Sequence, residues 1–192
     1  CPISPFDLQR TARLCDNELL LSYELTNRSQ DEEAFLWALH PLLAIRSGDQ
    51  IELPTRRIMT DTAVGCPLGE CGDRWDWPEP CPGIRLDRLD FGPHSSPAVK
   101  VYSEGLTEGR AAIVNAGTGE ALEFSFDPDK LDTVGVWINL GGWNGYHHVA
   151  IEPTNGAPDP LDVAARENRC GRISAGASTQ WNLSLKVIAP TS

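Results

Sequence analysis

The chain has 192 residues and a mass of 21.0 kDa, and 41% of its residues are hydrophobic, enough for one domain with a buried core. Its 16 Lys and Arg residues against 27 Asp and Glu residues give a formal net charge of −11. This balance argues against nucleic acid or an anionic membrane as a partner, because neutralising phosphates requires clustered cations. No apolar run approaches the roughly 18 residues that span a bilayer. We therefore expect a soluble, cytoplasmic protein.

Six cysteines are too few for a disulfide scaffold in a chain of this length. Cys66, Cys71 and Cys81 do not have metal-ligand spacing, so loop thiols, with room for one local disulfide, are favoured over structural zinc. This cysteine usage fits a reducing compartment. The chain begins at Cys1 without an export signal, which favours an upstream truncation over a lipidated mature protein.

Apolar and polar residues alternate with a period of two through most of the chain, which is typical of half-buried strands. The alternation is clearest at 18–27 and 181–187, near the two ends of the sequence. Further strands are expected at 35–45, 51–53, 98–102, 111–114, 122–126, 134–139 and 149–152. Gly, Pro, Asn or Asp residues bound these segments. An inventory of many strands with little helix favours a large antiparallel sandwich or open barrel. The predicted fold class is all-β.

One helix is expected, over residues 159–168. Asp159 is its predicted N-cap, Pro160 occupies the first turn, and Gly171 follows its end. The longest irregular segment, 66–93, is rich in Pro and contains two Trp residues. Loops of this length are usually functional or disordered, and the tryptophans argue against disorder.

His40 lies near the end of an otherwise apolar segment. In a continuous strand over 35–45, His40 would project from the face opposite Phe35 and Trp37, and Pro41 would end the hydrogen-bond ladder. Strand ends often carry site residues. A core or edge histidine bonded to a backbone carbonyl is the alternative explanation.

Glu152 ends a second apolar segment, immediately before Pro153. A buried carboxylate there would need a partner, because burying an unpaired charge is costly. The alternative is a glutamate that points into solvent. His148 shares a face with Glu152 while His147 points to the other face, so the two histidines make a poor metal chelate.

These motifs resemble the aldose 1-epimerase (galactose mutarotase-like) superfamily. The matching segments are Leu-Ser-Tyr-Glu-Leu-Thr-Asn at 21–27, Phe-Leu-Trp-Ala-Leu-His-Pro at 35–41 and Gly-Tyr-His-His-Val-Ala-Ile-Glu-Pro at 145–153. The resemblance extends from about residue 6 to residue 187. It implies a galactose mutarotase-like β-supersandwich, largely antiparallel and incomplete at its N-terminus. Residues 1–192 would form a single domain, corresponding to the C-terminal two thirds of the family's domain.

The resemblance also implies a mechanism and a site. Glu152 would take the proton of the anomeric hydroxyl, and His40 would donate one to the ring oxygen, so that the sugar ring opens and recloses without a metal or organic cofactor. The two side chains are expected to flank one pyranose ring. The sequence departs from the family in two respects: a second, upstream His is missing, and Leu42 and Leu43 replace the common aromatic pair.

Tryptophan usage is consistent with sugar binding, because aromatic faces stack on pyranose rings. Loop tryptophans are the better candidates, although packing over the sandwich end is an equal alternative, and the strand residues Trp137 and Trp181 are expected in the core. Arg74, in the same long loop, could recognise a sugar phosphate through its guanidinium group. The predicted substrate-binding residues are His148, Trp143, Trp77, Trp75 and Arg74.

Taken together, the sequence favours a mutarotase-like isomerase of carbohydrate metabolism that acts on a small-molecule sugar. The alternative is a non-catalytic carbohydrate-binding or regulatory protein on the same fold. An accessory domain of a carbohydrate lyase or hydrolase is a third and less favoured hypothesis. An exposed sheet edge would favour a homo-oligomer.

Overall fold

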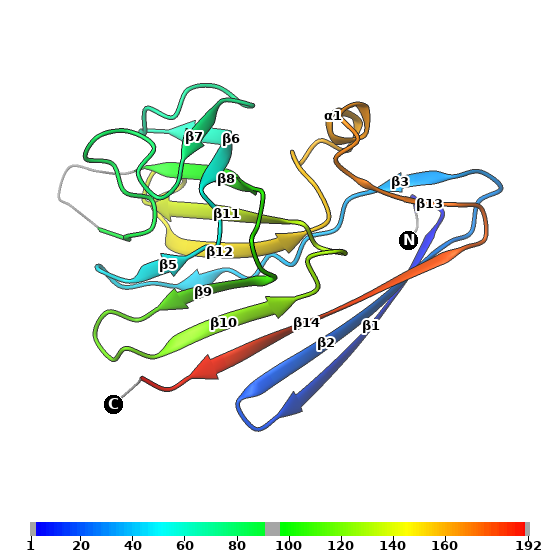
Figure 1. Ribbon diagram of the computed structural model, residues 1–192, viewed down its shortest axis with the longest axis horizontal. Helices are drawn as coiled ribbons and strands as arrows, with labels where there is room; N and C mark the ends of the chain where they lie inside the picture. The colour runs from blue at the N-terminus through cyan, green and yellow to red at the C-terminus, as the bar shows by residue number, and fades with distance from the viewer. Residues whose placement is uncertain (1–2, 91–96, 191–192) are drawn as a thin grey trace.

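The computed structural model describes residues 3–90 and 97–190 and is built almost entirely of strands (Figure 1). Its strands are β1 (Phe6–Cys15), β2 (Glu18–Asn27), β3 (Glu33–Phe35), β4 (Leu43–Ala44), β5 (Gln50–Glu52), β6 (Arg57–Val64), β7 (Arg74–Asp76), β8 (Ala98–Glu104), β9 (Arg110–Val114), β10 (Ala121–Phe126), β11 (Thr133–Leu140), β12 (His147–Thr154), β13 (Gly171–Ile173) and β14 (Ser178–Ile188). One helix, α1 (Leu161–Arg166), lies between β12 and β13.

Two six-stranded sheets form the molecule. Sheet 1 has the order β1-β2-β14-β10-β9-β5, and sheet 2 has the order β4-β12-β11-β8-β6-β7. All neighbouring strands in both sheets are antiparallel. The strands β3 and β13 form a separate two-stranded ribbon. The expectation of an all-β, largely antiparallel fold is therefore confirmed.

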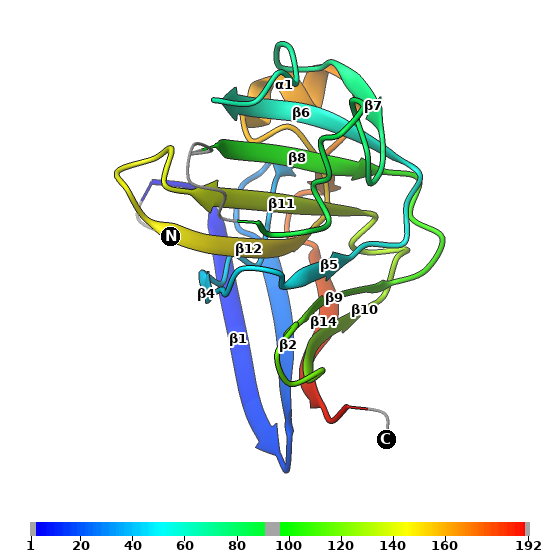
Figure 2. The same cartoon turned by 90° about the vertical axis from the view of Figure 1, so that its left-hand side faces the viewer.

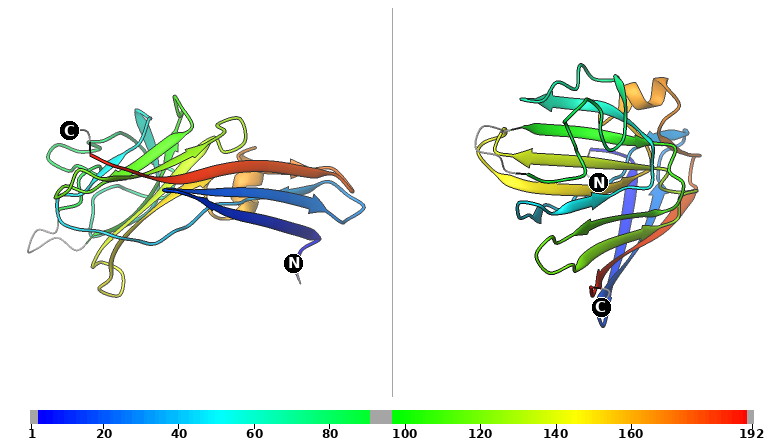
Figure 3. Two further views of the ribbon diagram at one scale, coloured as in Figure 1. Left: turned by 90° about the horizontal axis from the view of Figure 1, so that it is seen from below. Right: turned by 60° about the vertical axis from the view of Figure 1, so that its left-hand side comes forward.

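The hydrophobic core lies between the two sheets. Sheet 1 contributes residues such as Phe124 and Leu183, and sheet 2 contributes Val101, Val136 and Ile151. The long strands of sheet 1 run in a different direction from those of sheet 2 (Figure 2; Figure 3, right), as in crossed sandwiches. Because side chains alternate along each strand, the second face of sheet 2 is free to carry polar groups.

The predicted strand over 35–45 is wrong. The chain leaves the β3–β13 ribbon after Phe35 and enters sheet 2 only at β4, beside β12. Between the two, Ala38 makes a single bridge to Thr154. A segment that changes sheets cannot maintain one ladder, so the alternation assumed for His40 and Trp37 does not hold.

The helix is shorter than predicted, and Asp159 does not cap it. Pro160 occupies the N-cap position without a side-chain hydrogen bond, and Asp159 instead accepts hydrogen bonds from Lys100 and Tyr102. The described part of the long segment that begins at Cys66 ends at residue 90. It contains β7, and its residues Leu68 and Leu89 are buried in the core.

Cys15, Cys66, Cys71, Cys81 and Cys170 carry free thiols, so none of the described cysteines forms the local disulfide that the spacing left open. Cys1 lies outside the described residues. Across 3–90 and 97–190, no group of three or more His, Cys, Asp or Glu side chains is placed to hold a metal ion. Within the same residues, no helix has the length and apolar character needed to cross a membrane.

Leu183→Ala should lower the free energy of unfolding by about 2–5 kcal/mol, because truncating a buried leucine leaves a cavity in the core. Leu183 of β14 is 3% exposed. The same substitution at Leu14, which is 73% exposed on β1, should change it by less than about 0.5 kcal/mol. Urea unfolding of both variants measures the difference, and equal effects would contradict the proposed core.

Candidate active site

The candidate site lies on the outer face of sheet 2, the face that carries Glu152 and His148 of β12. The opposite face of the same strand carries Val149 and Ile151, which are buried in the core. Strand pairing places Gly135 of β11 directly between Glu152 and Tyr102 of β8. These residues therefore form one row across the sheet.

Gly135 allows the side chains on either side of β11 to approach one another. A Cβ at this position would lie 3.1 Å from Tyr102 Cε1 and 3.3 Å from Glu152 Cβ, which is tighter than ordinary packing. Lys100, one side-chain position away from Tyr102 on β8, reaches past this glycine to Glu152. The absence of a side chain on β11 thus makes a connection between β8 and β12 possible.

The carboxylate of Glu152 is almost completely buried, with 1% of its side chain exposed. Lys100 Nζ donates a hydrogen bond to Glu152 Oε2 at 2.8 Å and another to Asp159 Oδ2 at 3.1 Å. The hydroxyl of Tyr102 donates to Asp159 Oδ1. Four groups from β8, β12 and the segment before α1 therefore form one continuous polar chain.

The second carboxylate oxygen of Glu152 faces His40. His40 Nε2 lies 3.2 Å from Glu152 Oε1, but the contact lacks hydrogen-bond geometry, and among the described residues Oε1 has no hydrogen-bond partner. The His40 side chain is 46% exposed. It also lines a cavity of about 560 Å³, a volume within the usual range of small-molecule sites.

The surroundings of Glu152 act on its ionisation in opposite directions. Burial raises the pKa of the Glu152 carboxyl above its ordinary value of 4.5, while the positive charges of Lys100 and His40 act to lower it. Burial alone would lower the pKa of Lys100, but the carboxylates of Glu152 and Asp159 outweigh it and the net shift is upward. Burial, followed by Asp159, raises the pKa of Tyr102, so its hydroxyl remains a hydrogen-bond donor.

An aromatic group continues the outer face towards the β11–β12 loop. Trp137 Nε1 donates to His148 Nε2 at 3.0 Å, which requires that nitrogen of His148 to be unprotonated. Burial lowers the pKa of His148, and His40 and His147 add to the effect, in agreement with a neutral ring. Trp143 packs edge-on against Trp137 with ring centroids 6.5 Å apart.

Trp143 is 55% exposed, yet its backbone is firmly held. The buried side chain of Asn139 accepts a hydrogen bond from Trp143 N and donates one to Trp143 O. The exposed indole is therefore presented from a fixed loop. His148 and Trp143, two of the five predicted substrate-binding residues, lie in one aromatic group on the same face as Glu152.

The other three predicted substrate-binding residues lie elsewhere. Trp75 pairs with Ile58 on the core face of sheet 2, donates through Nε1 to Thr60 Oγ1 at 3.0 Å and packs against the core. Trp77 also packs against the core. Arg74 forms an ion pair with Glu104, with Nε at 3.0 Å and 3.1 Å from its two carboxylate oxygens.

The predicted positions of two tryptophans, Trp137 and Trp37, are wrong. Trp137 was expected in the core but is half-buried on the outer face beside His148. Trp37 was expected to face away from His40, but both residues line the same cavity, because the segment between β3 and β4 is not a strand. Trp181 is buried, as expected for a core residue.

Sequence reasoning missed Lys100, Tyr102 and Asp159. Lys100 lies within the apolar sequence Ala-Val-Lys-Val-Tyr. A charged residue in such a strand indicates a buried partner of opposite charge, because burying an unpaired charge is costly. Asp159 had the position of a helix cap, which concealed its other role. The pairing of β8 with β12 across β11 could not be read from the sequence.

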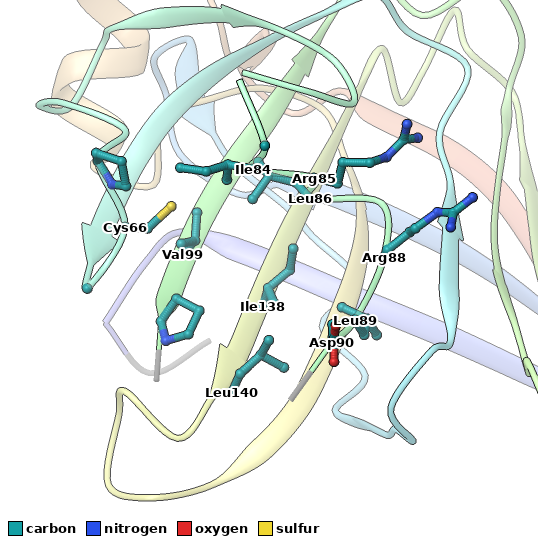
Figure 4. A pocket seen from close by; sticks show the side chains of 14 residues that line it. Cys66, Ile84, Arg85, Leu86, Arg88, Leu89, Asp90, Val99, Ile138 and Leu140 are labelled. Carbon is teal, nitrogen blue, oxygen red and sulfur yellow. The ribbon is translucent and has the colours of Figure 1, made fainter. Parts of the chain in front are cut away.

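A separate cavity of about 430 Å³ lies on the core face of sheet 2 (Figure 4). Val99, Ile138 and Leu140 form its floor, and residues of the segment after β6, including Ile84 and Leu86, cover it. Since Glu152 projects from the opposite face, this cavity is not part of the candidate site.

No protein-family model matches the sequence, and no curated protein matches it. Solved structures match it in fold. They include the Slr1438 protein from Synechocystis sp. PCC 6803 (TM-score 0.72, 16% identity), a candidate aldose 1-epimerase from Escherichia coli K12 (0.70, 19%) and a galactose mutarotase-like protein from Lactobacillus casei (0.66, 18%).

The alignments cover 96%, 97% and 95% of this chain but 55%, 62% and 63% of those three chains, respectively. The chain thus spans between half and two thirds of the length of these three proteins. At these identities the likeness concerns the arrangement of strands and leaves residue roles to be argued from the site itself. The structural match over 95–97% of the chain shows that it adopts the galactose mutarotase-like fold.

Proposed function

We propose that this protein is an aldose 1-epimerase-like isomerase of carbohydrate metabolism, with Glu152 as the general base and His40 as the general acid. We also propose that residues 1–192 form a single domain of the galactose mutarotase-like fold. One observation carries the proposal: the buried oxygen Glu152 Oε1 has no hydrogen-bond partner among the described residues and lies 3.2 Å from His40 Nε2. A buried carboxylate oxygen normally has a partner. A sugar hydroxyl would supply it.

The reaction requires two coupled proton transfers. Glu152 removes the proton from the anomeric hydroxyl, the C1–O5 bond breaks as the C1 carbonyl forms, and protonated His40 donates its proton to O5. Rotation about C1–C2 in the open-chain aldehyde, followed by the reverse transfers, closes the ring with the other anomeric configuration. Protons and electrons balance without an external reactant.

The contact between Glu152 and His40 changes how the substrate would be placed. At 3.2 Å, the two side chains leave no room for a pyranose ring between them, so the expectation that they flank the ring is wrong for this arrangement. The anomeric oxygen and the ring oxygen are bonded to the same carbon. Neighbouring acid and base groups can therefore address the same edge of the sugar from one side.

Access to Glu152 would involve His40. The carboxylate is buried, whereas His40 is half-exposed and borders the cavity of about 560 Å³. A small displacement of the imidazole would let the anomeric hydroxyl reach Oε1. Trp137, Trp143 and neutral His148 add aromatic surface to the outer face of sheet 2, the face that carries Glu152. Aromatic surface of this kind suits the C–H face of a pyranose.

A non-catalytic carbohydrate-binding protein is the second candidate, and a specific observation favours it. Glu152 is 1% exposed and already paired with Lys100, as a purely structural ion pair would be. In that case the outer face would bind a sugar without exchanging its anomers. The two candidates differ in the effect of Glu152 on exchange and not in sugar binding.

Glu152→Gln should reduce catalysed anomer exchange of an aldose by about 100-fold or more, because general acid–base groups typically contribute 10²–10⁴-fold. Two-dimensional exchange NMR of the α and β anomeric signals, over a panel of common aldoses, measures the rate. Binding of 1,5-anhydro analogues, which cannot open, should change only a few-fold, since the amide retains the shape of the side chain.

Glu120→Gln provides the matched control, because Glu120 is exposed on the β9–β10 turn of sheet 1. It should leave exchange at the wild-type rate. Wild-type protein that binds the analogues but does not accelerate exchange would instead assign the site to the non-catalytic candidate.

The pH dependence of kcat/KM for anomer exchange should show an acid limb with a midpoint above 4.5. Only ionised Glu152 can accept the proton, and burial raises the pKa of its carboxyl above that ordinary value. Activity should therefore rise with pH through the shifted pKa. A limb at or below 4.5 would contradict Glu152 as the base.

A further inference from the structure

We propose that Lys100 is the positioning residue of Glu152, and that Asp159, itself oriented by Tyr102, limits how strongly Lys100 acts on the base. This inference rests on the proposed function, because Lys100 can position a general base only if Glu152 is one. Its physical content, the control of Glu152 by Lys100 and Asp159, can be measured independently of any reaction.

The geometry gives Lys100 a double attachment. Its Nζ lies 2.8 Å from Glu152 Oε2 and 3.3 Å and 3.1 Å from the two carboxylate oxygens of Asp159. The side chain is 9% exposed. Because Lys100 binds Oε2, the other carboxylate oxygen, Oε1, is directed towards His40.

Stability alone does not account for this arrangement. Replacing a buried ion pair by well-packed apolar residues is often neutral or stabilising, because desolvation of the charges offsets their attraction. Lys100 lies between Val99 and Val101 in a central strand of sheet 2, where an apolar residue would be usual. A buried lysine that holds one oxygen of a carboxylate and leaves the other without a hydrogen bond has a geometry suited to positioning a base.

Asp159 occupies a different environment from Glu152. Its side chain is 61% exposed, although it accepts hydrogen bonds from both Lys100 and Tyr102. Ala157, two residues earlier, packs with Tyr102 and Met59 in a small buried cluster on the outer face. This packing holds the segment before α1 over β8 and so fixes Asp159 beside Lys100.

The groups that act on Glu152 come from several elements. Lys100 on β8 and His40 from the segment between β3 and β4 favour its ionised form, and Asp159 from the segment before α1 disfavours it. Gly135, its neighbour on β11, carries no charge, and Tyr102 keeps its proton. On β12 itself, His148 is neutral and bonded to Trp137.

Two substitutions should therefore shift the ionisation of Glu152 in opposite directions. Lys100→Met removes the closest positive charge and should raise the midpoint by about 1–3 pH units, the usual effect of a neighbouring opposite charge. Asp159→Asn removes a negative charge and frees Lys100 from competition, so it should lower the midpoint. General loosening of the fold would move both variants in the same direction.

The experiment is a ¹³C NMR titration of the glutamate carboxyl carbons in the intact chain, with the Glu152 signal assigned by its loss in Glu152→Gln. The acid limb of anomer exchange is recorded on the same samples. Lys130→Met is the matched control, because Lys130 is exposed and is not part of this network. It should leave both midpoints unchanged.

The outcomes separate this inference from the proposed function. An unshifted Glu152 titration in Lys100→Met, or shifts of the same sign in both variants, would overturn the role of Lys100 and Asp159. If Lys100→Met does not fold, a midpoint in Asp159→Asn equal to or above that of wild type overturns it. Opposite shifts in a protein that does not accelerate exchange would support the control of Glu152 while rejecting catalysis.

Discussion

The burial of one carboxylate imposes the constraint on which the rest of the site depends. Glu152 projects from β12 of sheet 2 with 1% of its side chain exposed, and an isolated charge in that position would be costly. Lys100 compensates it from β8, across a strand that has a glycine at the crossing point. Asp159 then accepts hydrogen bonds from Lys100 and from the hydroxyl of Tyr102. The polar network follows from this single charge.

The fold makes such a network possible because the two faces of sheet 2 differ. One face packs against the crossed strands of sheet 1 and is apolar. The other is partly covered by the segment before α1, which brings Asp159 to Lys100. The segment between β3 and β4 runs beside β12 at the edge of the sheet and brings His40 to Glu152. Irregular segments therefore complete a site whose base and lysine stand on regular strands. That division is common where rigid scaffolds hold functional side chains.

The same architecture is compatible with either a catalytic isomerase or a non-catalytic sugar-binding protein. A buried carboxylate oxygen normally has a hydrogen-bond partner, and an oxygen without one is available to accept a substrate proton. The position of His40 favours catalysis, because His40 lies beside the oxygen of Glu152 that has no hydrogen bond and also borders a cavity. The aromatic surface of Trp137 and Trp143 serves either function equally well.

The sequence by itself determined the all-β class, the core strands, and the order of motifs that led to His40 and Glu152, because alternation and short motifs are local properties. It misassigned the segment 35–45, which changes sheets, and it placed Asp159 at a helix cap and Trp137 in the core. Only the tertiary structure decided that Lys100 meets both Glu152 and Asp159, residues that are 52 and 59 positions away from it in the sequence. Register across three antiparallel strands controls that meeting, and local sequence carries no information on register between distant strands.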